Sequence, residues 1–244
     1  MEKSLLRPVW QKVFRIDIIF ISIMFILLGL IRVTGLYREE INLVVFGFLI
    51  MWVLPVIFFS THGRRSIGIK KPERWLWLIL SFLLGLLAAV AFYFLGYLLY
   101  GTGIENWGMT VAREFSGQEE VLMPAIFAVV TLFSMLFSPI GEELFFRGMI
   151  QEVLAERLSS DKLASFWGSF LFAAIHLPQH DIFFSGSGFF SILIPLAIWF
   201  ILMFLVSILF IFARVKSGSI FGAIACHSGY ILGMNLFVYH VLLQ

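Results

Sequence analysis

Charged residues are scarce in this sequence of 244 residues, and cysteine is nearly missing. Lysine, arginine, aspartate and glutamate together make up 13% of the chain, whereas a soluble domain carries about 25%. So few charges do not cover a water-exposed surface, which excludes a cytosolic enzyme or a secreted module. The single cysteine, Cys226, excludes an internal disulfide and a cysteine-rich zinc site. The net charge of +2 is too small to indicate nucleic-acid binding.

Apolar residues are abundant instead, at 61% of the chain with a mean hydropathy of +0.99. A transmembrane helix needs about 20 mostly apolar residues. The segments that come close to this are Ile16–Ile31, Ile41–Phe59, Trp75–Tyr100, Met123–Ile140, Leu163–His176, Phe189–Phe212 and Ile220–Leu243. The fifth is short, and the apolar pattern of the fourth continues to about Ile150. The sequence therefore predicts an all-α fold, a polytopic transmembrane bundle of about seven spans, as a single integral-membrane domain over residues 1–244.

Basic residues mark one side of the predicted bundle. They occur in the N-terminal segment, in the second loop and before the last span: Lys3, Arg7, Lys12, Arg15, Arg64, Arg65, Lys70, Lys71, Arg74, Arg214 and Lys216. With alternating spans all of these share one side, which the positive-inside rule assigns to the cytoplasm. Acidic residues gather in the loops of the other side: Glu105, Glu114, Glu119, Glu120 and Asp181. We expect a multi-pass protein of a prokaryotic plasma membrane with a cytoplasmic N-terminus.

One dense group of charges interrupts an apolar region. Residues 138–148 read Ser-Pro-Ile-Gly-Glu-Glu-Leu-Phe-Phe-Arg-Gly and contain Glu142, Glu143 and Arg147. A charge at the centre of a membrane helix costs about 2.5–3.5 kcal/mol on insertion scales, so such residues have a function or a partner. Glu143 and Arg147 share a helix face and are expected to pair, which leaves Glu142 without that partner. The alternative, a solvated patch at a helix end, fits poorly with the apolar flanks.

Two histidines also lie within predicted spans, and one of them is expected to meet Glu142. The polar stretch Glu156–Lys162 is typical of a turn between two helices. Glu142 precedes this turn by about as many residues as His176 follows it, so an antiparallel hairpin brings the two to one depth. His227 lies inside the last span. A lone histidine in a membrane is often a packing residue, but three titratable groups at comparable depth indicate a polar cavity.

These motifs, in this order, resemble those of the CAAX-protease and bacteriocin-processing family of intramembrane endopeptidases, also called the Abi family. The resemblance extends from about Val121 to the C-terminus, with the catalytic motifs within residues 138–235. The matching residues are Glu142-Glu143-x-x-x-Arg147, Phe172-x-x-x-His176 and His227. The resemblance implies a helical intramembrane fold with its catalytic cavity between helices. It also implies hydrolysis of a peptide bond in a membrane-associated protein or peptide.

The resemblance implies a role for each of these residues. Glu142 would be the general base that activates water. His176 would orient that water or Glu142, and His227 would help to stabilise the oxyanion. The site would be shaped by Glu143, Arg147 and Phe172.

One position departs from the family pattern. The family usually has asparagine or a similar polar residue four positions after this last histidine, where the present chain has Ile231. Asn235 lies one turn further, and Ser228 is a second candidate for the auxiliary role. Loss of one oxyanion donor costs around 10²–10³ in rate in studied enzymes. Slow hydrolysis, use of an auxiliary donor, or loss of activity are the expected alternatives.

Two mechanisms and two other functions stay open at this point. We expect no cofactor and favour metal-free hydrolysis, because Glu142 is needed as the base. The alternative is a zinc enzyme whose ligands are Glu142, His176 and His227, with one position left for water. A scaffold or immunity protein of the same fold is supported by Ile231 but disfavoured by the retained titratable groups. A transporter is less favoured still, because the charges form one cluster and not a track.

Overall fold

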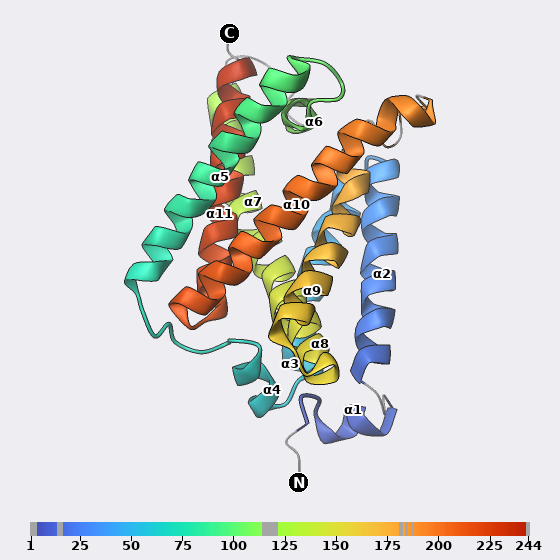
Figure 1. Cartoon of the computed structure of the whole chain (residues 1–244), viewed down its shortest axis with the longest axis vertical. Coiled ribbons are helices and arrows are strands. Elements are labelled where there is room, and N and C mark those ends of the chain that lie inside the picture. The colour runs from blue at the N-terminus through green and yellow to red at the C-terminus, as the bar shows by residue number, and fades with distance from the viewer. Residues whose placement is uncertain are drawn as a thin grey trace.

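The computed structural model describes residues 4–13, 17–113, 122–180, 183, 185–186 and 188–242. Along this part of the chain it shows a bundle of long helices with short ones at its ends (Figure 1). The helices are α1 (Pro8–Val13), α2 (Asp17–Tyr37), α3 (Ile41–Phe58), α4 (Thr61–Ser66), α5 (Leu76–Tyr100), α6 (Trp107–Arg113), α7 (Met123–Glu142), the π-helix η1 (Glu143–Ile150), α8 (Gln151–Leu158), α9 (Asp161–His176), the 3₁₀-helix η2 (Leu177–Gln179), α10 (Phe189–Ser217) and α11 (Ile220–Leu242). The predicted all-α class is confirmed.

Six helices of the described residues are long and apolar enough to cross a membrane. They are Asp17–Tyr37, Ile41–Phe58, Leu76–Tyr100, Met123–Leu158, Ile192–Ser217 and Ile220–His240. The remaining predicted span corresponds to α9, a helix of 16 residues. It is too short to cross a bilayer alone and packs against α8 and α10 (Figure 1). The prediction of a multi-pass helical bundle is thus confirmed. Six helices of the described residues, and not the predicted seven, are long enough to cross a membrane.

The first long helix continues further than predicted. We expected a span that ends at Ile31 and a loop that begins at Arg32, but α2 continues to Tyr37. Arg32 therefore lies within a helix, and only 7% of it is exposed. This difference places a buried positive charge in the membrane-spanning part of the protein.

The three basic segments lie at one end of the bundle, as predicted. The backbone nitrogen of Ser60 donates to the carbonyl oxygen of Leu5 over 2.8 Å. The backbone nitrogen of Glu73 donates to the carbonyl oxygen of Ser217 over 2.9 Å. The cytoplasmic assignment of this end stays a prediction. Of the residues on which it was based, Lys3, Arg15, Glu114, Glu119, Glu120 and Asp181 lie outside the described residues.

The acidic cluster lies where the helix geometry changes. α7, η1 and α8 form one continuous rod, and the turn type switches to π directly after Glu142. Pro139, just before this point, cannot donate a backbone hydrogen bond in the helix interior. Single π segments of this kind are frequent at functional sites. All eight residues of η1 are buried, so this segment holds Glu143 and Arg147 inside the bundle.

Helices α5 and α11 touch through glycines. A Cβ atom at Gly85 would overlap the carbonyl oxygen of Cys226, and one at Gly229 would overlap the carbonyl oxygen of Phe82. Small residues allow such close approach of two backbones, which is a common way for helices to associate in membranes. The contact fixes the position of α11, the helix that carries His227.

Candidate active site

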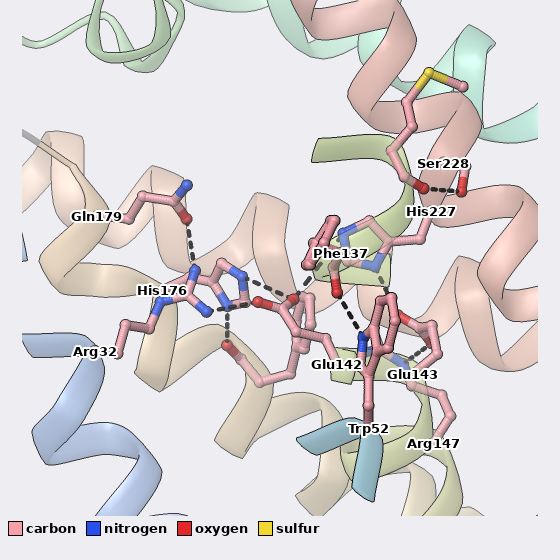
Figure 2. A network of polar contacts seen from close by, with 12 residues as sticks. Arg32, Trp52, Phe137, Glu142, Glu143, Arg147, His176, Gln179, His227 and Ser228 are labelled. Atoms are coloured by element: carbon pink, nitrogen blue, oxygen red, sulfur yellow. Dashed lines mark hydrogen bonds and ion pairs between the residues drawn. The ribbon is translucent and has the colours of Figure 1, made fainter. Parts of the chain in front are cut away.

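Four charged side chains and two histidines form one polar network inside the bundle (Figure 2). Glu142 and Glu143 have no exposed surface, and Arg147 is 1% exposed. The network is built from four separate segments of the chain, because α7 and η1 are continuous. Its members are Arg32 of α2, Glu142 at the end of α7, Glu143 and Arg147 of η1, His176 at the end of α9 and His227 of α11.

Glu142 uses its two carboxylate oxygens differently. Oε1 accepts a hydrogen bond from Nη1 of Arg32 at 2.6 Å. Oε2 lies 3.4 Å from Nε2 of His176 and 4.0 Å from Nε2 of His227, and accepts no hydrogen bond from the described residues. Glu142 therefore lies beside His176, as the hairpin argument expected, and His227 is also close to it. The expectation that Glu142 has no cationic partner was wrong, because Arg32 reaches it from a helix 110 residues earlier in the chain.

Glu143 binds the partner that the sequence predicted and one more. Its Oε2 lies 3.2 Å from Nε of Arg147, four residues later. Its Oε1 lies 2.8 Å from Nδ1 of His227. Glu143 thus joins η1 to α11 and fixes the orientation of the His227 ring.

The hydrogen bonds of the two histidines determine their tautomers. Nδ1 of His176 lies 2.6 Å from the carbonyl oxygen of Phe172, which only accepts, so Nδ1 carries the hydrogen. Nδ1 of His227 faces the Glu143 carboxylate, paired with Arg147, and likewise donates. In the neutral rings both Nε2 atoms are then acceptors. Three acceptors, one from Glu142 and one from each histidine, face a common point.

Aromatic rings enclose the site. Phe172, a predicted site-shaping residue, packs on His176 with ring centroids 4.2 Å apart and lies 3.9 Å from the Arg147 guanidinium carbon. Phe210 stacks on His227 at 4.5 Å and lies 4.9 Å from the same guanidinium carbon. Arg147 therefore contacts two aromatic faces as well as Glu143, and these cation–π contacts offset part of the cost of burying its charge.

The predicted auxiliary residues lie elsewhere. The Ser228 hydroxyl donates to the carbonyl oxygen of Met135 over 2.7 Å. The side-chain amide of Asn235 donates to the Thr131 hydroxyl over 3.1 Å. Both side chains thus tie α11 to α7 and do not join the network around Glu142.

Sequence reasoning missed three residues of this site: Arg32, Gln179 and Phe210. The apolar pattern around Arg32 continues to Tyr37, so a lone charge within a long apolar helix was a signal that could have been used. Gln179, whose Oε1 accepts from Nη2 of Arg32 at 3.1 Å, follows a proline and gave no signal. Phe210 is one of 29 phenylalanines and was not distinguishable from the others.

A zinc site made of Glu142, His176 and His227 does not fit the observed geometry. Two ligand atoms of a tetrahedral zinc ion lie roughly 3.3–3.4 Å apart, whereas Nε2 of His227 is 4.0 Å from Oε2 of Glu142. Arg32 also places a positive charge on the same carboxylate. In the described part of the chain, no group of three His, Cys, Asp or Glu side chains is arranged to hold a metal ion.

Comparison with known proteins identifies the segment that carries this site. Residues 124–232 match the family model described as Type II CAAX prenyl endopeptidase Rce1-like. No curated protein and no solved structure matches the chain. The matched segment includes every member of the network except Arg32, which α2 supplies. The match supports the resemblance seen in the sequence: over residues 124–232 the chain is similar to type II CAAX prenyl endopeptidases.

Proposed function

We propose that Glu142 is the general base of this endopeptidase and activates water for attack on a peptide bond of a membrane-associated protein or peptide. The observation that carries the proposal is the convergence of three acceptor atoms, Oε2 of Glu142 and Nε2 of His176 and His227. A water molecule has two O–H groups, so it can donate to Oε2 of Glu142 and to one histidine Nε2 at the same time. General-base catalysis by a positioned side chain contributes about 10²–10⁴-fold in rate.

The proton movements follow from the partners of each group. Glu142 takes one proton from the water as the oxygen bonds to the carbonyl carbon of the substrate. His176 holds the same water through Nε2, and its bond to Phe172 keeps the ring oriented. The proton then passes to the nitrogen of the leaving amine as the C–N bond breaks. Glu143 faces Nδ1 of His227 and holds the ring with Nε2 toward the water, so His227 is a second acceptor for the O–H group that Glu142 does not take.

The substrate class follows from where the site lies. Glu142 is enclosed by membrane-spanning helices and has no exposed surface. A peptide reaches it only when neighbouring helices separate, so we propose a substrate that is held at or in the bilayer. The family description includes prenylated CAAX tails, and a bacteriocin leader or a sorting signal has the same membrane association.

The direct test compares new protein N-termini in membranes of cells that express wild type or Glu142→Gln at equal folded levels. We expect a set of N-termini that only the wild type produces, and these identify the substrate and the cleaved bond. Glu73→Gln is the matched control, because Glu73 is an exposed acid that pairs with Lys70 and with no member of the network. Identical profiles for wild type and Glu142→Gln would contradict the proposal and favour a scaffold that retains the fold.

The proposed mechanism uses no metal. We therefore expect the cleavage rate of purified protein in proteoliposomes to stay unchanged after treatment with 1,10-phenanthroline and dialysis. Zinc, in contrast, would be needed if the two histidines and Glu142 moved together around an ion. Loss of activity with the chelator, followed by recovery with added zinc, would show that the enzyme depends on zinc and would contradict the metal-free mechanism.

A further inference from the structure

Arg32 connects a helix outside the family-matched segment to the proposed base. It lies on α2, at the edge of the bundle in Figure 1. Nη1 of Arg32 donates to Oε1 of Glu142 at 2.6 Å, and Nη2 donates to Oε1 of Gln179 at 3.1 Å. The guanidinium group therefore bridges the end of α7 and the turn after α9 (Figure 2).

The charge balance of the network requires this residue. Two buried carboxylates, Glu142 and Glu143, face two buried guanidinium groups, Arg32 and Arg147. Arg147 lies in the same helix segment as Glu143 and balances it. A buried carboxylate that loses its counter-ion is strongly unfavourable, so Glu142 depends on the charge that α2 supplies.

The hydrogen-bond geometry between Arg32 and Glu142 shows which carboxylate oxygen Arg32 occupies. Arginine and carboxylate groups frequently pair through two parallel hydrogen bonds, which occupy both carboxylate oxygens. Here Nη2 of Arg32 donates to Gln179, so that only Nη1 donates to Glu142. Oε1 is held while Oε2 stays directed at His176 and His227.

We infer that Arg32 is a positioning residue of the hydrolytic site: it binds Oε1 of Glu142, and Gln179 limits it to that oxygen, so that Oε2 is left to bind and deprotonate water. The inference rests on the proposed function, since it assigns Arg32 a role in the same reaction. It makes α2 part of the working site, although the family match covers only residues 124–232. Arg32 acts through Glu142 and does not itself touch the reacting bond.

The test measures kcat and KM in proteoliposomes with a peptide that spans the cleavage site found from the new N-termini. For Arg32→Gln we expect kcat per folded molecule to fall about 10²-fold, the cost of a misplaced catalytic group, with KM changed less than about threefold. Arg32→Lys restores the charge and recovers part of the loss. Gln179→Ala, which frees the second arm of Arg32 to cover Oε2, also lowers kcat although it removes no charge.

A second measurement does not depend on activity. Arg32→Gln should lower Tm in the wild-type background by roughly 10 °C and have little effect in the Glu142→Gln background, where the partner charge is already removed. Equal decreases in both backgrounds would show that Arg32 does not depend on Glu142 and would overturn the inference.

The kinetic outcomes separate this inference from the proposed function. If wild type cleaves, Glu142→Gln does not, and Arg32→Gln keeps the wild-type kcat, the inference alone fails. If Arg32→Gln and Arg32→Lys lower kcat equally and Gln179→Ala leaves kcat unchanged, Arg32 is only a packing contact and the inference fails. If cleavage does not depend on Glu142, the proposed function fails and the inference fails with it.

Discussion

Replacement of Glu142 by glutamine is expected to lower kcat by about 10²–10⁴-fold, the usual contribution of a general base. Glutamine has nearly the same shape, and its amide oxygen is still able to accept the hydrogen bond from Arg32. It cannot take a proton from water, so the chemical step loses its base. The measurement is kcat per folded molecule in proteoliposomes, with the peptide that spans the cleavage site.

Two controls make this result specific. Glu142→Gln leaves Arg32 buried without its counter-ion, so Tm is expected to fall, and activity has to be measured well below the new Tm. Glu73→Gln removes an exposed acid and should keep both kcat and Tm at their wild-type values. If the folded Glu142→Gln protein cleaves at the wild-type rate, Glu142 is not the general base.

Replacement of Arg147 by alanine is expected to cause the largest loss of stability. It leaves Glu143 with no exposed surface and no guanidinium partner, and removal of one member of a buried ion pair costs about 3–5 kcal/mol. The contacts of Arg147 with Phe172 and Phe210 are lost as well. For a chain of this size the change corresponds to a fall in Tm of roughly 6–20 °C, measurable by thermal unfolding in detergent.

The partner acid provides the control for this second prediction. In a Glu143→Gln background the negative charge is already gone, so Arg147→Ala should cost less than in wild type. The difference between the two costs measures the coupling of the pair. Equal costs in both backgrounds would mean that Arg147 stabilises the protein through the aromatic rings and not through Glu143.

The sequence was sufficient for those parts of the site that depend on local geometry. The Glu143–Arg147 pair follows from helix spacing, and the meeting of Glu142 with His176 follows from equal distances to one turn. Both contacts need only the rise and period of a helix. The short α9 was visible as a short apolar segment, although its packing against α8 and α10 was not.

The rest of the site depends on how distant helices pack. Arg32 was placed in a loop because the predicted span ended at Ile31, while the helix in fact continues past it. Its pairing with Glu142 joins segments 110 residues apart, and no local pattern encodes that contact. Ser228 and Asn235 were candidates because they lie near His227 in the sequence, but their faces of α11 meet α7.

The complete enclosure of Glu142 has a consequence for how the proposed peptidase chooses substrates. Chemistry has to wait for an opening motion, and such motions occur on timescales of microseconds to milliseconds. A peptide anchored in the same bilayer stays beside the protein through many openings, because its tether keeps the effective concentration high. A soluble peptide with the same sequence collides briefly and leaves. On the proposed function, the enclosure would therefore select substrates by how long they stay beside the protein as well as by their sequence.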